Sequence, residues 1–153
     1  MPAHFPIAAI TDEFSPDLET AVRSMAEIGL TGAELRMVFG KNIIDLTDEE
    51  LDRAIAMVRG RGLEIVSIAS PLLKCVLPDS PDVDARFQQD MFAAKHTFAD
   101  QPRLTARAFE IAARTGAGIV RVFSYWRTVR PEASLIAWWK PCAAWPIVPP
   151  GTT

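Results

Sequence analysis

The sequence predicts an α/β fold built from repeated units of one parallel β-strand and one α-helix. Three observations predict this fold. Short apolar runs end in polar residues, amphipathic helical patterns follow them, and glycines stand where the helices should end. Strands that alternate with helices are typical of parallel sheets with right-handed crossovers. We therefore expect the carboxyl ends of the strands to share one edge of the sheet.

The first unit begins with an apolar run at residues 7–10 that fits a buried strand and ends in the polar residues 11–13. Ser15 suits the N-cap of the following helix, and Pro16 suits its first position. This helix should end at Gly29. Its predicted buried face consists of Leu18, Ala21, Val22, Met25 and Ile28.

The second unit begins with a strand predicted over residues 32–36. Its helix starts near Thr47, which has capping-box spacing with Glu50, and it ends at residues 60–62. The third strand, residues 64–69, is rich in β-branched residues and is the clearest strand in the chain.

A long irregular stretch, residues 72–101, follows the third strand. A loop of this length in a compact domain is usually either a functional lid or a disordered insert. Residues 83–98 could form a short helix within it, although their periodicity is poor. A well-patterned helix then begins at Gln101 and leads, after Gly116, to a fourth strand at residues 119–123.

The pattern stops after Glu132, so we divide the chain into residues 1–132 and an irregular tail, residues 133–153. The tail holds three of the four tryptophans, several prolines and no acidic residue. So many prolines argue against another patterned helix. One interpretation is an exposed, apolar C-terminus. The other, which we favour, is that the original reading frame was lost near Glu132.

Composition limits the possible functions. The chain has 153 residues, of which 49% are hydrophobic, which suffices for one domain with a sizeable core. A net charge of -3 offers no basic face for nucleic acid and no polybasic membrane anchor. Cys75 and Cys142 have neither zinc-ligand nor disulfide-framework spacing. With no secretory leader and no long apolar run, we expect a cytoplasmic protein whose partners are small molecules or proteins.

Polar side chains follow each predicted strand. They include Asp12 and Glu13 after the first strand, Glu34 and Arg36 at the end of the second, Lys74 after the third, and Trp126 after the fourth. Ligands of parallel α/β sheets bind outside the carboxyl ends of the strands. The sequence therefore predicts a site for a polar metabolite at this edge.

Four segments also carry a resemblance to a known family. They read ITDEFSPD at 10–17, GAELR at 32–36, SPLLK at 70–74 and RVFSYWR at 121–127. Across about residues 4–132 the chain resembles the first half of the sugar phosphate isomerase/epimerase family, the xylose-isomerase-like TIM barrels. The resemblance implies a partial TIM barrel, with about the first four strands of a (β/α)8 barrel that takes roughly 250 residues when complete.

The same resemblance implies a chemistry. Members of this family isomerise or epimerise a sugar or related polyol by metal-dependent proton transfer beside a carbonyl, with Mn, Mg, Co or Zn as the expected divalent metal. Their metal-binding carboxylates and histidine come mainly from the second half of the barrel. We therefore expect that this chain alone does not bind the metal, and we assign no catalytic or metal-ligating residue.

Eight residues are candidate substrate-binding groups. We expect only one of Glu34 and Arg36 to point into the mouth of the barrel, and we favour Glu34. The alternative for this pair is a salt bridge at the rim, which would contribute little stability. Asp12 and Glu13 would contact sugar hydroxyls, or else solvate their loop and favour the following helix N-terminus.

The other four candidates each have an alternative role. Lys74 would bind a carboxylate or phosphate, or be a solvated loop lysine. His96 would reach over the substrate, or be exposed. Arg121 lies within a strand, so its charge must enter the barrel interior or pair with a neighbour. Trp126 would stack on a sugar face, or pack under the loop.

Three functional hypotheses follow. The first is the N-terminal half of a metal-dependent sugar isomerase or epimerase. The second is a non-catalytic half-barrel that self-associates through its open apolar edges, near Ile7 and Ile119, or binds a small polar metabolite. The third is a small doubly wound domain that binds an anion at its helix N-termini, against which the lack of a glycine-rich loop speaks.

Overall fold

The computed structural model describes residues 5–78, 80, 82–84, 86 and 96–132. Most of the helix considered over residues 83–98, and the whole predicted tail, lie outside these residues. In the described part, four parallel strands form one sheet with the order β1-β2-β5-β6. The predicted α/β class is confirmed.

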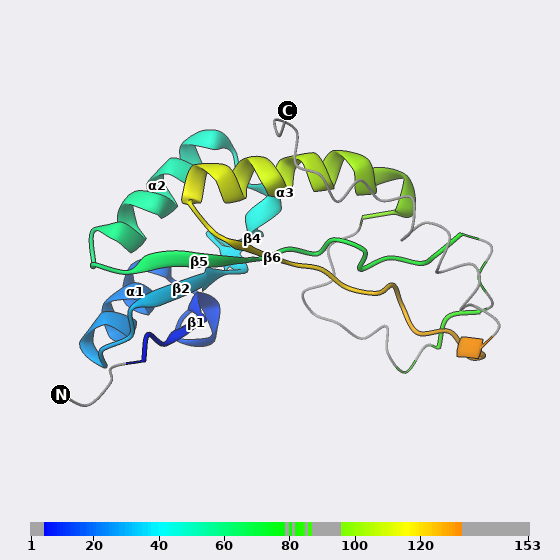
Figure 1. Cartoon of the computed structure of the whole chain (residues 1–153), viewed down its shortest axis with the longest axis horizontal. Coiled ribbons are helices and arrows are strands. Elements are labelled where there is room, and N and C mark those ends of the chain that lie inside the picture. Colours follow the sequence, from blue (N-terminus) through cyan, green and yellow to red (C-terminus); the bar gives the residue numbers. More distant parts are fainter. Residues whose placement is uncertain (1–4, 79, 81, 85, 87–95, 133–153) are drawn as a thin grey trace.

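Strands and helices alternate along the chain (Figure 1). The sheet strands are β1 (Ala8–Ile10), β2 (Gly32–Leu35), β5 (Glu64–Ala69) and β6 (Ile119–Arg121). The helices are α1 (Leu18–Glu27), α2 (Asp48–Arg59) and α3 (Gln101–Thr115), and 3₁₀ turns occupy η1 (Thr11–Glu13), η2 (Ile43–Asp45) and η4 (Phe98–Asp100). A separate hairpin pairs β3 (Met37–Val38) with β4 (Lys41–Asn42).

The three helices cover one face of the sheet. On β2, Ala33 and Leu35 are fully buried, and the register places them beside Ile65 and Ile68 of β5. Side chains of a strand alternate between faces, and a register shift between Ala33 and Glu34 leaves Ile65 and Ile68 on the same face although they are three residues apart. They form a single core with one stripe of each helix, made up of Leu18, Val22, Met25, Leu51, Ala54, Ile55, Val58, Leu104, Ala108 and Ile111.

No described helix covers the opposite face, which we call the open face. It carries Ala8, Ile10, Gly32, Glu34, Ser67, Ala69, Ile119 and Arg121. Ile119 is 61% exposed. Gly32 is required there, since a Cβ would lie 2.8 Å from the Ala8 Cβ and 3.0 Å from a Val66 methyl carbon. Parallel sheets are normally covered on both faces.

Several local predictions are confirmed because they depend only on neighbouring residues. Thr47 and Glu50 form the full capping box at the start of α2. The bounds of β5 are those predicted. Gly116 ends α3 in the left-handed conformation, with φ of 74°.

Helix α1 begins later than predicted. Asp17, and not Ser15, is the N-cap, and its carboxylate accepts the N–H of Thr20 at 2.9 Å. Pro16 therefore precedes the helix instead of opening it. Ile28, predicted to be buried, is 66% exposed because it is the C-cap residue, past the last turn that faces the sheet.

The outer strands also differ from their predictions. Strand β1 is not buried, since it lies at the edge of the sheet and its residues are exposed or half-buried. Strand β6 ends at Arg121, two residues early. Beyond that point the backbone N–H of Phe123 donates to the carbonyl of Leu72, in the loop after β5, at 2.9 Å.

This hydrogen bonding ties the loops after β5 and β6 together, and they run side by side in Figure 1. Farther along, the N–H of Trp126 donates to the carbonyl of Cys75, and Val83 forms an isolated bridge with Thr128. The described beginning of the irregular stretch, residues 72–78, is thus attached to the chain that leaves β6.

Candidate functional site

The carboxyl ends of the sheet strands bring together polar side chains that are far apart in the sequence. We call this group the strand-end cluster, and it consists of Asp12, Glu34, Arg36, Ser70, Lys74 and Arg121. Arg36 follows β2, Ser70 and Lys74 follow β5, and Arg121 ends β6. The predicted convergence of polar groups at this edge is present.

Asp12 and Arg36 form the most enclosed ion pair of the cluster. The Asp12 side chain is 7% exposed, and its Oδ2 lies 3.0 Å from Nε and 2.8 Å from Nη2 of Arg36. Its Oδ1 accepts the N–H of Met37 at 3.2 Å. The hydrogen bond that Arg36 donates to Asp12 raises the pKa of Arg36, so this guanidinium stays charged. Asp12 therefore anchors the loop after β1 to the end of β2.

Glu34 lies on the open face beside Arg121. Its Oε1 is 3.7 Å from Nη1 of Arg121, and its side chain is 23% exposed. The expectation that only one of Glu34 and Arg36 could face the site is wrong, because residues two apart in a strand point to the same face. Arg36 lines the same small cavity as Arg121, so both predicted groups reach the site.

The Arg121 side chain has a buried polar atom at this edge of the sheet. Its Nε is buried, and none of the described groups accepts a hydrogen bond from it. A buried N–H without an acceptor costs free energy. The cavity beside Arg121 has a volume of about 10 Å³, which holds roughly one water molecule or one ligand oxygen.

Lys74 also lines this cavity. Its Nζ lies 4.8 Å from the ring centre of Phe123 and 5.9 Å from that of Trp126, within the range of cation–π contact. The predicted Trp126 therefore reaches the cluster through Lys74. The guanidinium of Arg121 also lies 5.3 Å from the centre of the Phe123 ring, so both cations are within cation–π distance of one aromatic ring.

Two predicted residues lie at the margin of the cluster or outside it. The Glu13 side chain is 60% exposed and 3.4 Å from Nη2 of Arg36. His96 lies against η2, with Nε2 3.4 Å from Oδ1 of Asp45, and it does not line the cavity between Arg36 and Arg121.

Five residues that line the cavity were not among the candidates, and three of them, Ser70, Phe123 and Asn42, bear on its geometry. Ser70 donates its hydroxyl to the Arg121 carbonyl at 2.6 Å and so joins β5 to β6. Phe123 supplies the ring described above. Asn42 arrives from the β3–β4 hairpin, whose turn residues Phe39 and Gly40 have φ of 53° and 75°. Two successive positive φ values are typical of a type I′ turn, and the Gly in this stretch is the signal that could have indicated it.

The residues of this edge suit a polar ligand better than a metal. Guanidinium and ammonium groups donate to hydroxyl, carboxylate or phosphate oxygens, and Glu34 can accept from hydroxyls. Asp12, Glu13 and Glu34 each lie within ion-pair distance of an arginine, which would repel a divalent cation. Among the described residues, no three His, Cys, Asp or Glu side chains gather as metal ligands would.

The one described cysteine is not a nucleophile at this site. Cys75 is buried, and burial raises the pKa of its thiol to about 11. The thiol is therefore protonated at neutral pH, and it is the thiolate that reacts.

The strand-end cluster is the main observation that bears on function. Within the described ranges, no helix has the length and apolar character needed to cross a membrane. The chain matched no protein-family model, no curated protein and no solved structure.

Proposed function

We propose that this chain forms the N-terminal half of a (β/α)8 barrel of the sugar phosphate isomerase/epimerase type, and that its strand-end cluster binds a small sugar, sugar phosphate or polyol. The observation that carries the proposal is the convergence of Glu34, Arg36, Lys74 and Arg121 at the carboxyl edge of a parallel sheet. That edge is where parallel α/β folds bind their ligands.

The strand order supports a barrel in preference to a doubly wound sheet. The four strands lie in the order in which they occur in the sequence, with all three helices on one face. A doubly wound sheet reverses its strand order at the ligand site and has helices on both faces. In a barrel, the open face would become the interior, closed by strands outside the described residues.

The small cavity indicates how a ligand would bind. With room for about one oxygen atom, it cannot enclose a sugar ring. The ring would lie over the open face and place one hydroxyl, carboxylate or phosphate oxygen beside Nε of Arg121. Glu34 and Lys74 would then contact neighbouring oxygens. This arrangement would satisfy the buried N–H of Arg121.

These residues supply binding groups, and the proton transfer that the family resemblance implies is not assigned to any of them. Under this proposal, the acid–base residues and the divalent metal ligands come from strand ends outside the described residues. The carboxylates at this edge are paired with arginines and do not fit the metal.

A binding experiment tests the proposal. The full chain is titrated with a pentose phosphate, a hexose phosphate and the matching neutral sugars, and binding is followed by calorimetry. We expect Arg121→Met to weaken binding about 10-fold or more, because a hydrogen bond to a charged group is typically worth about 1.5–3 kcal/mol. Arg23→Met, an exposed arginine of α1, is the matched control and should bind as the unmodified chain does. No binding of any of these compounds, or equal losses in both variants, would contradict the proposal.

A second candidate function is a half-barrel that pairs with a copy of itself. The observation that favours it is the apolar exposure at the two outer strands, where Ile7 is 60% and Ile119 is 61% exposed. Two open edges and one open face would be covered in such a dimer. Light scattering tests this candidate, and a monomer at all accessible concentrations would count against it.

A further inference from the structure

Lys74 of the strand-end cluster lies on a turn whose backbone is strained. The N–H of Lys74 donates to the carbonyl of Pro71 at 3.0 Å and closes a turn in which Leu73 is the third residue. Leu73 has a φ of 61°. A positive φ at the third position is typical of a type II turn, where glycine or asparagine normally stands. A leucine in this left-handed conformation costs free energy, so other contacts must hold it there.

Gln101, the first residue of α3, makes one of these contacts. It is 1% exposed, and its Oε1 accepts the backbone N–H of Leu73 at 2.8 Å. Its Nε2 donates to the carbonyl of Thr97 at 2.9 Å. Only one orientation of the amide group satisfies both bonds, because the N–H of Leu73 needs an oxygen and the carbonyl of Thr97 needs an N–H. The side chain of Gln101 is therefore fixed at both ends.

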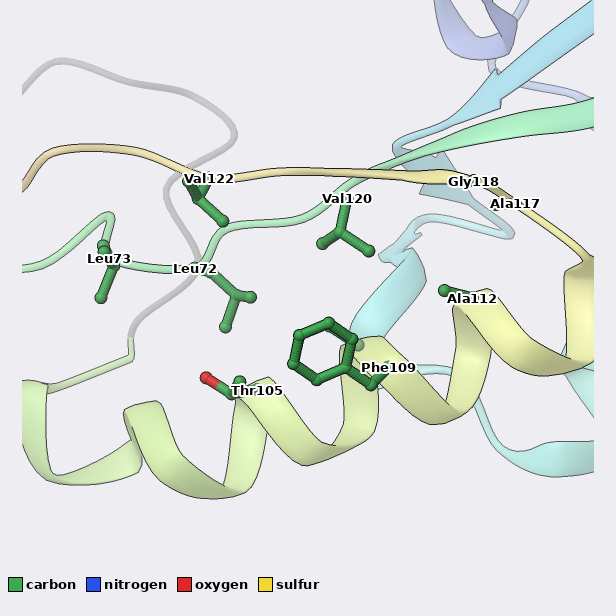
Figure 2. Close-up of a pocket in the computed structure, with 10 residues that line it drawn as sticks. Leu72, Leu73, Thr105, Phe109, Ala112, Ala117, Gly118, Val120 and Val122 are labelled. Carbon is green, nitrogen blue, oxygen red and sulfur yellow. The ribbon is translucent and has the colours of Figure 1, made fainter. Parts of the chain in front are cut away.

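The chain that leaves β6 makes the second contact. The N–H of Tyr125 donates to the carbonyl of Leu73 at 3.0 Å, and Tyr125 is itself left-handed, with φ of 68°. Figure 2 shows Leu73 between the part of α3 that carries Thr105 and the chain that carries Val122. Leu73 is thus held from one side by Gln101 and from the other by Tyr125.

We propose that Gln101 is a positioning residue of the strand-end cluster: it holds Leu73 in the left-handed conformation and so directs Lys74 toward the ligand. This inference rests on the proposed function, in which Lys74 contacts a ligand oxygen. The φ angle of a residue sets the direction of the chain that follows it. A change of Leu73 to a negative φ would therefore move the Lys74 ammonium away from the Phe123 ring and from the cavity that it lines.

Gln101 acts on the site only through this turn. It is buried, and it does not line the cavity between Arg36 and Arg121. Without its Oε1, the N–H of Leu73 would lose its acceptor, and the strained turn would lose a contact that offsets its cost. The expected result of removing Gln101 is a displaced Lys74 on an otherwise intact sheet.

Chemical labelling of lysine side chains tests the proposal without a ligand. The full chain is treated with N-hydroxysuccinimidyl acetate, and the acetylation rate of each lysine is measured by peptide mass spectrometry. Lys74 is half-buried and lies within cation–π distance of Phe123 and Trp126. We expect Gln101→Met to accelerate acetylation of Lys74 about twofold to fivefold, the factor that corresponds to one lost cation–π contact. The rate at Lys41 should stay unchanged.

Thr115→Val is the matched control. Thr115 is another buried polar residue of α3, and its hydroxyl donates to the carbonyl of Ile111 in the same helix. This substitution should leave the acetylation rate of Lys74 unchanged. Gln101→Glu keeps an oxygen that can accept the N–H of Leu73, so it should label as the unmodified chain does. No acceleration in Gln101→Met, or an equal acceleration in Thr115→Val, would overturn the proposal.

Leu73→Gly separates the left-handed conformation from general destabilisation. Glycine adopts a φ of this sign without steric cost, so the turn depends less on Gln101 in this background. Gln101→Met should then accelerate acetylation of Lys74 less than it does in the unmodified chain. An equal acceleration in both backgrounds would overturn the proposal.

Binding of a ligand shows whether Gln101 acts through Lys74. In calorimetric titrations with a pentose phosphate and a hexose phosphate, Lys74→Met and Gln101→Met should each weaken binding about 10-fold. The double variant should bind no more weakly than Lys74→Met, because residues that act as one unit are not additive. Losses that multiply, or no loss in Lys74→Met, would overturn the proposal. Failure of the unmodified chain to bind would contradict the proposed function, and the labelling would then decide the role of Gln101 by itself.

Discussion

The two faces of the four-stranded sheet differ in almost every physical respect. On the covered face, Leu35 and Ile68 are fully buried against helices. On the open face, Glu34, one position before Leu35 on β2, forms a partly exposed ion pair with Arg121 of β6, and Ile119 of β6 is mostly in contact with solvent. The covered face is a packed hydrophobic core, whereas the open face and its strand ends carry the charged groups of the proposed site.

This difference shows how one short strand can serve two purposes. Strand β2 has four residues, of which Ala33 and Leu35 hold the helix layer while Glu34 reaches the site. Alternation of side chains separates the two roles without any additional structure. Substitutions on the two faces should therefore affect stability by very different amounts.

The largest effect is expected on the covered face. Leu35→Ala removes a fully buried side chain and leaves a cavity, which typically costs about 2–5 kcal/mol of unfolding free energy. Urea denaturation followed by circular dichroism measures the loss. A loss under about 1 kcal/mol would contradict the assignment of this face as the core.

A smaller effect on stability, which should appear only at acid pH, is expected for the ion pairs between α2 and α3. Asp48 at the start of α2 lies 2.9 Å from Nη1 of Arg107 and 2.6 Å from Nη1 of Arg114, both on α3. The Arg107 hydrogen bond, followed by that of Arg114, lowers the pKa of Asp48 below its ordinary value of 3.8. Because the fold holds the pKa of Asp48 below 3.8, the ionised carboxylate stabilises the folded state at pH values above 3.8. This stabilisation is lost as the pH falls from 3.8 toward the lowered pKa of the folded state.

We therefore expect Asp48→Asn to lose stability less steeply than the unmodified chain as pH falls below about 4. Unfolding midpoints in urea, measured across the acid range, provide the comparison. Replacing Arg107 and Arg114 together by Met, with Asp48 in place, should flatten the profile similarly. Parallel profiles for all three proteins would contradict the role of Asp48 in joining α2 to α3.

The smallest effect is expected on the open face. Ile119→Ala truncates a side chain that is 61% exposed, and exposed substitutions usually change stability by less than about 0.5 kcal/mol. The same urea experiment used for Leu35→Ala makes the comparison direct. A loss as large as that of Leu35→Ala would mean that the open face is covered in solution.

The site residues show what sequence patterns can and cannot predict. Asp12, Glu34, Arg36, Lys74 and Trp126 were predicted at one edge because parallel strands end together, and the structure brings them there. Arg121 was predicted to lie within a strand, and its side chain lies beside Glu34 at the same edge. Their pairing could not be predicted, since Asp12 meets Arg36 only after β1 and β2 align. His96 follows a long irregular stretch, and no periodicity there could predict where its side chain would point. The side chain lies against Asp45 and not at the strand-end cluster.

The sequence by itself determined the position of most helices and sheet strands in the described part of the chain, because caps, glycine ends and apolar periodicity act between residues a few positions apart. The capping box at Thr47 and the bounds of β5 are examples. Only the tertiary structure decided that β1 is a half-exposed edge and that Arg121 lies beside Glu34 and lines one cavity with Arg36. Those features depend on which strands lie side by side and which face the helices cover, and no local pattern contains that information.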